Sequence, residues 1–219
     1  MIKLSDMKRD IILKLRLNDL FNLIKILSEK LRGLDFSSII SSEDVGLDPS
    51  LFHRSSPSGG KYLSDVIKDI DIIKYNSIID IGCGKGSAIR AMINFPFKRV
   101  DGLEASKEIA RIAINNFGKL EEKRTKIFIC DAINFDRYGD YDIFYFYNPF
   151  PAQVMNQVVE KIRSAFQNLD KEILIIYNNP ICHNLIIDSG FSLVKEFPDE
   201  WNNRIYLYSN KAYLKNRAQ

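Results

Sequence analysis

Residues 77–95 read SIIDIGCGKGSAIRAMINF and decide the fold. The first seven residues, SIIDIGC, form an apolar run typical of a buried strand, and KGSAIRAMINF (85–95) is typical of a helix. The turn between them is rich in glycine, which allows positive φ angles and lets a ligand approach the backbone closely. A strand, a glycine turn and a helix in this order predict the first βα unit of a parallel sheet.

The same alternation continues to the C-terminal end of the sequence. Further strands are predicted at 98–104, 125–130, 141–147, 172–177, 191–197 and 203–209, and helices at 62–72, 106–120, 154–166 and 181–189. Strands that are apolar throughout favour a parallel sheet covered on both faces. No helix separates the last two strands, so they should form an antiparallel hairpin at one edge. We predict an α/β, Rossmann-like, doubly wound and mostly parallel seven-stranded sheet with an antiparallel last strand.

An N-terminal helical extension precedes this domain. Apolar residues recur there in alternating steps of four and three, at Leu13, Leu17, Leu20, Ile24, Leu27, Leu31 and Leu34. The stripe fits a helix packed on its own domain, which we favour, or a coiled-coil dimer arm. Residues 35–60, rich in Ser, Gly, Pro and Asp, predict an irregular connector. We expect residues 1–60 to form a helical cap and connector over the carboxyl ends of the strands, and residues 61–219 to form the main domain.

Composition excludes several classes of protein. The 219 residues are 46% hydrophobic and 27% charged, with a net charge of +3. Residues 1–34 hold eight Lys or Arg against four Asp or Glu, whereas the other 185 hold 23 against 24. A nucleic-acid partner is therefore not expected for the main domain. The three cysteines are far apart in the sequence, which argues against disulfides and a metal site, and no apolar run could span a membrane. We expect a cytoplasmic protein, as a monomer or a homodimer.

Polar residues and glycines stand where the predicted strands end, which is where ligands of doubly wound sheets bind. Glu104 closes its strand, and a carboxylate there can accept hydrogen bonds from both hydroxyls of a ribose. Asp131 can accept one from an adenine amino group. The turn at 80–86 is neither a dinucleotide fingerprint, which needs a glycine where Ser87 stands, nor a phosphate-binding P-loop.

In order and spacing, the turn and the two acids resemble the cofactor site of class I S-adenosylmethionine-dependent methyltransferases. The segments IIDIGCGKG (78–86), GLEAS (102–106), YNPFP (147–151) and YNNP (177–180) are similar to a bacterial family of these enzymes whose substrates are unassigned. The resemblance implies S-adenosyl-L-methionine as the cofactor and no metal. It implies that the cofactor contacts Asp80, Gly82, Cys83, Gly84, Gly86, Glu104, Ala105, Asp131, Ala132 and Asn148.

The methyl acceptor stays open. The motif Asn148-Pro149-Phe150 is similar to the Asn-Pro-Pro-Tyr/Phe motif of amino-group methyltransferases, with Phe150 in place of the second proline. We expect these three residues to form the acceptor side of the site, without a role in proton transfer. A small molecule, a glycan or a protein is the favoured acceptor, and a nucleic acid or another amino group is the alternative. A nicotinamide oxidoreductase and a non-catalytic binding module are disfavoured.

Overall fold

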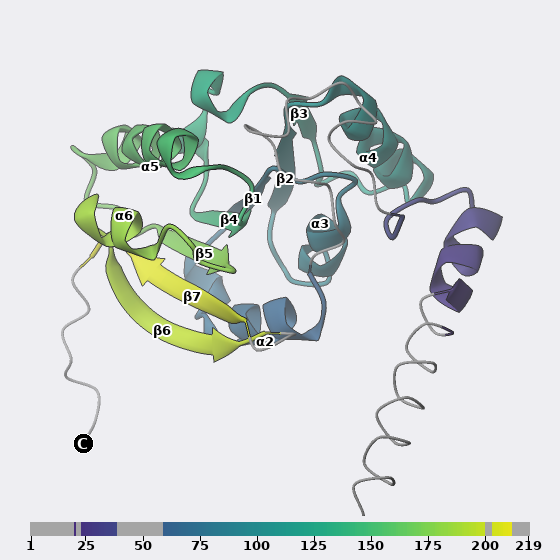
Figure 1. Ribbon diagram of the computed structural model, residues 1–219, viewed down its shortest axis with the longest axis horizontal. Coiled ribbons are helices and arrows are strands. Elements are labelled where there is room, and N and C mark those ends of the chain that lie inside the picture. The colour runs from purple at the N-terminus through teal and green to yellow at the C-terminus, as the bar shows by residue number, and fades with distance from the viewer. Residues whose placement is uncertain (1–19, 21–22, 39–58, 200–202, 212–219) are drawn as a thin grey trace, which may run out of the picture.

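The computed structural model describes residues 20, 23–38, 59–199 and 203–211, which form a sheet with helices on both faces (Figure 1). The strands are β1 (Ser77–Ile81), β2 (Arg99–Glu104), β3 (Ile127–Ile129), β4 (Ile143–Tyr147), β5 (Leu174–Asn178), β6 (Ser192–Pro198) and β7 (Arg204–Ser209). The helices are α2 (Lys61–Asp69), α3 (Ser87–Met92), α4 (Lys107–Lys119), α5 (Ala152–Phe166) and α6 (His183–Asp188). Short 3-10 turns are η2 (Ile72–Lys74), η3 (Ala132–Asn134) and η4 (Tyr138–Asp140).

The seven strands lie in the order β3-β2-β1-β4-β5-β7-β6. Strands β1 to β5 are parallel, and β7 is antiparallel to both β5 and β6. The predicted fold class is therefore confirmed, including the hairpin at one edge. The direction of winding reverses between β1 and β4, so the carboxyl ends of these two strands flank the crevice where such folds bind ligands.

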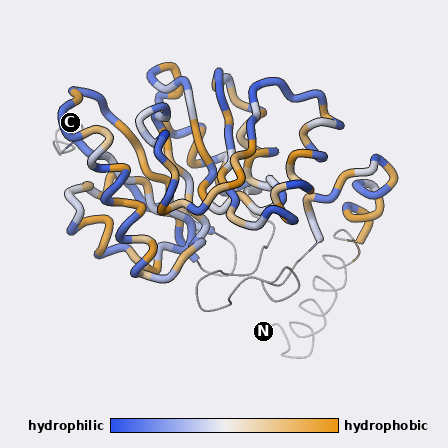
Figure 2. The backbone as a smooth tube through the Cα atoms, turned by 90° about the horizontal axis from the view of Figure 1, so that it is seen from above, coloured by the Kyte–Doolittle hydropathy of each residue, from blue (hydrophilic) through white to orange (hydrophobic). Residues whose placement is uncertain are grey.

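Two apolar clusters hold the layers together, one on each face of the sheet. On one face α2 and α3 pack over β1, β4 and β5, for example through Val66, Ile89 and Ile176. On the other face α5 and α6 cover the same strands, for example through Val158 and Ile186. Burying each such side chain contributes about 1.5–3 kcal/mol. The strands run as largely hydrophobic stretches through the middle of the molecule (Figure 2).

Element ends differ from the predicted ones where the backbone turns left-handed. β1 ends at Ile81, two residues earlier than predicted, because Gly82 has a φ of 78°. α3 begins only at Ser87, because Gly86 has a φ of 87° and caps the helix. β4 ends at Tyr147 as predicted, where Asn148 takes a left-handed φ of 42°. These three bends turn the chain away from the sheet at the edge where the candidate site lies.

The N-terminal extension packs on the domain only in part. Residues 23–31 are helical, and Leu34 is buried in the core beside Phe36. Leu20, Ile24 and Leu27 are about half exposed, and Leu31 is 90% exposed. The described part of the domain therefore leaves these four residues about half exposed or more, and packing of the whole stripe on its own chain stays a prediction. Leu13, Leu17 and most of the predicted connector (39–58) lie outside the described residues, so the cap and the boundary at residue 60 stay predictions.

In the part of the chain that the structure describes, no helix combines the length and the apolar character that crossing a membrane requires.

Candidate functional site

The glycine turn after β1 lies directly against the loop after β4. The backbone N–H groups of Gly82 and Cys83 both donate to the carbonyl oxygen of Leu103, at 2.8 and 3.0 Å. A Cβ atom on Gly82 would lie 2.7 Å from the Cβ of Pro149. Such a contact is too close for a real side chain, so only glycine fits here. The structure thus brings together two motifs that are nearly seventy residues apart in the sequence.

Glu104 ends β2 and holds the glycine turn to the start of α4. Its Oε2 atom accepts a hydrogen bond from the N–H of Gly84 at 3.0 Å, and Oε1 accepts one from Ser106 at 2.9 Å. Burial raises the pKa of this carboxyl, although the backbone hydrogen bonds act to lower it. Each carboxylate oxygen has about two acceptor sites, so both atoms keep capacity for a ligand hydroxyl.

Asp80 is a buried carboxylate inside β1. It is 2% exposed, and its Oδ2 atom has no hydrogen-bond partner among the described residues. Burial, and secondarily the charge of Glu104, raises the pKa of Asp80 well above its usual value. A buried carboxylate with an unpaired oxygen is costly, and a cationic ligand group would relieve that cost. Burial and both carboxylates also raise the pKa of the Cys83 thiol, so it stays protonated.

The raised pKa of Asp80 predicts a pH-dependent cost in stability. Since the folded protein holds this proton more tightly than the unfolded chain, stability should fall as the pH rises above about 4 and through the raised pKa. Asp80→Asn removes this titration. As the pH rises above about 4, we expect the melting temperature of the variant to increase relative to that of the wild type. A difference in melting temperature between the two proteins that stays the same at every pH would contradict the raised pKa of Asp80.

Asp131 and Ala132 follow β3 at the same edge of the sheet. Glu104 pairs with Ile129 in the register of β2 and β3, so Asp131 lies two residues beyond that pair. One oxygen of Asp131 caps η3 by accepting a hydrogen bond from the N–H of Ile133 at 2.9 Å. The carbonyl oxygen of Ala132 accepts one from Tyr138 at 2.7 Å. The loop that was predicted to face an adenine ring is thus held in a fixed conformation.

Asn148 and the end of β5 form the other wall of the crevice. The Tyr177 hydroxyl donates a long hydrogen bond of 3.4 Å to Oδ1 of Asn148. Asn178 pairs with Tyr147 at the end of the two strands, and its buried Oδ1 atom has no partner among the described residues. The residue that follows, Asn179, has a left-handed φ of 52°. Amide groups therefore gather where β4 and β5 end.

A pocket of about 420 Å³ opens beside these amides. Its lining is uncharged and consists of Asn148, Phe150, Pro151, Ala152, Ile181, Cys182, Asn184 and Leu185. Phe150 is only 8% exposed and packs mainly in the core. Of the predicted acceptor residues, Asn148 and Phe150 line this pocket, whereas Pro149 packs on Gly82. The residues from α6 and the loop before it were not predicted, because nothing in their sequence marks them.

Sequence reasoning also missed Lys85, which the structure joins to the N-terminal extension. Lys85 lies inside the glycine turn and is 3% exposed. Its ammonium group binds Oδ1 of Asp35 at 2.8 Å and the hydroxyl of Ser38. Asn116 of α4 accepts from the Asp35 N–H at 2.9 Å and donates to the Asp35 and Lys85 carbonyl oxygens at 2.8 and 3.1 Å.

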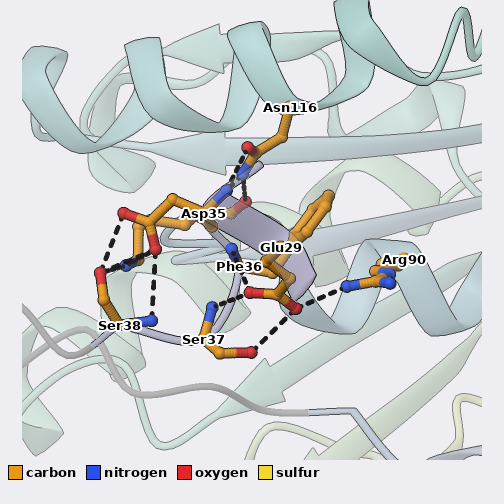
Figure 3. A network of polar contacts seen from close by, with 8 residues as sticks. Glu29, Asp35, Phe36, Ser37, Ser38, Arg90 and Asn116 are labelled. Atoms are coloured by element: carbon orange, nitrogen blue, oxygen red, sulfur yellow. Dashed lines mark hydrogen bonds and ion pairs between the residues drawn. The ribbon is translucent and has the colours of Figure 1, made fainter. Parts of the chain in front are cut away.

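Glu29 secures the same segment from its other side (Figure 3). This buried carboxylate accepts hydrogen bonds from the N–H groups of Phe36 and Ser37, at 3.1 and 3.0 Å, and pairs with Arg90 of α3 at 2.7 Å. The Phe36 ring packs edge-on against Phe117. The Arg90 guanidinium lies 4.8 Å from the centre of the Phe36 ring. Residues 29–38 are therefore built into the surface around the glycine turn.

Asp35→Ala should destabilise the protein, since it leaves the buried Lys85 ammonium without its counter-charge. The Asp35 side chain is 39% exposed, so water offsets part of the loss. We therefore expect the free energy of unfolding, measured in urea, to fall by about 1–3 kcal/mol. Asp65→Ala is the matched control, because the Asp65–Lys68 pair is exposed on both sides. Removing the Asp65–Lys68 pair should lower the free energy of unfolding by about 0–0.5 kcal/mol. Equal effects of the two variants would refute the structural role of the Lys85 contact.

Comparisons with known proteins bear on the fold. No protein-family model and no curated protein matches this sequence. Among solved structures, the chain is similar to the mitomycin 7-O-methyltransferase MmcR, with 20% identity and a TM-score of 0.51 over 66% of this chain and 52% of that one. It is also similar to the putative methyltransferase yhhF from Escherichia coli, with 14% identity and a TM-score of 0.54 over 71% and 90%.

A third similar structure is magnesium protoporphyrin IX methyltransferase (ChlM) from Synechocystis PCC 6803 with bound SAM, at 15% identity and a TM-score of 0.50 over 67% of this chain and 74% of that one. The chain matches about half the length of MmcR. The strand order and these likenesses define the fold of this protein as that of the class I methyltransferases.

Proposed function

We propose that this protein is an S-adenosyl-L-methionine-dependent methyltransferase. The observation that carries the proposal is the buried, unpaired Oδ2 atom of Asp80 next to the glycine turn. An unpaired buried carboxylate needs a cation, and this cofactor brings both an ammonium and a sulfonium group. A nicotinamide dinucleotide brings a pyrophosphate instead, which offers no ammonium or sulfonium group to Asp80.

The residues present fit the rest of the cofactor as well. Glu104 has acceptor capacity for two ribose hydroxyls, and the left-handed glycines leave the backbone of the turn open to close approach. Asp131 and Ala132 lie at the same edge, where an adenine ring would extend from the ribose. Ala105 and Cys83 would contribute backbone groups. Asn148 stands between the cofactor side and the pocket of about 420 Å³.

When bound, the cofactor supplies a methyl group that is already activated on a sulfonium, so the protein needs to supply no nucleophile. The part of this chain is to hold the acceptor in line and to exclude water. The Pro149 contact with Gly82 fixes the spacing between cofactor turn and acceptor wall. The uncharged lining of the pocket favours an uncharged acceptor group on a small molecule, a glycan or a protein.

An amino-group acceptor is the second candidate, and it includes a nucleic-acid base. Its support is Asn148, which lines the pocket and whose Oδ1 atom, among the described residues, receives a long hydrogen bond from Tyr177. An acceptor with N–H donors could pair with that oxygen. The cap over the site that we predict for residues 1–60 would close either kind of pocket against water.

Calorimetry with S-adenosylmethionine, S-adenosylhomocysteine and NAD tests the cofactor. We expect both of the first two ligands to bind and NAD not to bind. Tight binding of NAD without either of the others would overturn the proposal. The acceptor can then be sought by incubating the protein with methyl-labelled cofactor and fractionated lysate, and by asking which fraction takes up the label.

Asn148→Gly should lower the rate of methyl transfer about 100-fold, since it removes the amide that faces the acceptor, equivalent to about 2.7 kcal/mol. Glycine accepts the left-handed backbone, so the loop should keep its shape. Asn179→Gly is the matched control, because it removes an amide from the other left-handed asparagine nearby. Initial rates of label uptake measure both variants. A full rate for Asn148→Gly would remove this residue from the acceptor wall.

A further inference from the structure

The helix at residues 23–31 carries apolar side chains that the described domain does not cover. Leu20, Leu23, Ile24 and Leu27 are 51–53% exposed, and Leu31 is 90% exposed. Figure 1 shows this helix at the margin of the domain, away from the sheet. Monomeric proteins tolerate single exposed leucines but rarely a continuous row of them. We define Leu20, Ile24, Leu27 and Leu31 as the leucine stripe.

The helix is held so that the leucine stripe points away from the domain. At about 100° per residue, the four stripe residues fall within roughly 60° of one another, and Glu29 lies about 170° from their midline. Glu29 is the residue that binds Arg90 and the backbone of Phe36 and Ser37. Since the opposite side of the helix is fixed to the domain, the stripe cannot turn inward without breaking these contacts.

The end of the helix is equally well defined. The N–H of Leu34 donates to the Glu29 carbonyl oxygen at 2.8 Å, and Gly33 takes the left-handed conformation that ends many helices. Lys119 of α4 donates to the Gly33 carbonyl oxygen at 2.6 Å, and Leu34 enters the core. The C-terminal end of the helix that carries the leucine stripe is therefore fixed to the domain.

We propose that the leucine stripe is the interface of a homodimer, in which two copies of this chain pair their N-terminal helices as a two-stranded coiled coil. The stripe has the spacing of alternating a and d positions in a heptad repeat, with Leu20 and Leu27 at d and Ile24 and Leu31 at a. The same steps extend to Leu17 and Leu13 in the sequence, which gives about three heptads.

A second copy fits this surface better than an unrelated partner. Knobs-into-holes packing needs apolar residues with the same period of 3.5 residues on both helices. A second copy of this chain supplies a helix with that period. A two-fold interface is self-complementary, so the same stripe serves both sides. The e and g positions that flank Leu27 are Leu23, Ser28 and Lys30, so only one of the three carries a charge. This proposal does not depend on the proposed activity.

Sedimentation velocity and light scattering of the full chain test the dimer. We expect a mass of about twice 25.3 kDa for the wild type. Leu27→Lys places an ammonium in the middle of the stripe and should weaken dimerisation at least about 100-fold, giving a monomer at micromolar concentration. Ser28→Lys introduces the same charge one residue away and should remain a dimer. Unchanged thermal melting of the domain shows that both variants are folded.

Two results would overturn the proposal. A wild type that is monomeric at about 100 μM would show that the stripe does not pair copies of this chain. A Leu27→Lys variant that stays dimeric would place the interface elsewhere. If the wild type is monomeric and Leu27→Lys also melts at a lower temperature, the stripe is covered by other residues of its own chain.

Discussion

Glu104→Ala should weaken the binding of S-adenosylmethionine by about 1–3 kcal/mol, or about 5- to 150-fold in Kd. The variant removes the carboxylate at the end of β2 that we propose as the acceptor for two ribose hydroxyls. It also frees the N–H of Gly84, which Glu104 binds at 3.0 Å, so the glycine turn loses its link to α4. Titration calorimetry measures the affinity directly. The fold should survive, because the carboxylate lies at the end of a strand.

The control for this variant is Glu108→Ala, in the first turn of α4. Glu108 is exposed and close in sequence, but it does not contact the glycine turn in the described structure. Its loss should leave cofactor affinity within about twofold. If Glu104→Ala lowered only the melting temperature and left the affinity unchanged, Glu104 would be no more than a cap of α4. That outcome would also remove one support of the proposed function.

Gly86→Ala should destabilise the protein by about 2–5 kcal/mol. Gly86 has a φ of 87°, where an L-residue costs roughly 1–2 kcal/mol. Its added Cβ would lie 2.4 Å from the ring of Phe117, which is buried against Phe36. Overpacking of this kind costs about 1–3 kcal/mol more. Urea unfolding followed by circular dichroism measures the loss.

Gly118→Ala is the matched control, one residue from Phe117 in the sequence. Gly118 lies within α4, and no atom stands within 4 Å of the Cβ that alanine would add. Because alanine favours a helix over glycine by about 1 kcal/mol, this variant should be neutral or stabilising. Similar losses for both glycines would mean that the geometry around Gly86 is not what limits the substitution.

Much of the sheet was predictable because its signals are local. Each parallel strand is a short apolar run, such as Ile143–Tyr147 in β4, bounded by polar or turn residues. Asp80 lies within such a run, Glu104 ends one, and the glycine turn and Asp131 come just after one. Parallel strands end at one edge, so their final residues had to meet there whatever the strand order. Amino-acid type and position in the strand were enough to predict a ligand site at this edge.

The order of the last two strands depended on packing between distant segments. Both read as strands of similar length, yet β7 lies inside the sheet and β6 at the edge. Ile205 and Tyr208 of β7 are fully buried, whereas Lys195 and Glu196 of β6 are exposed. Charged residues on an edge strand prevent further strand pairing. The sequence predicted the hairpin. Which of its two strands lies inside the sheet depended on which strand could be covered on both sides.

The sequence by itself determined the class of fold and the edge at which we propose a ligand site, because both follow from hydrophobic period and residue type over a few positions. Only the tertiary structure decided that Lys85 pairs with Asp35, fifty residues earlier, and that Pro149 rests on Gly82. It also decided that the leucine stripe faces outward, since Glu29 binds Arg90 on the opposite side of the helix. Contacts between distant residues depend on how whole elements pack, and no local pattern specifies them.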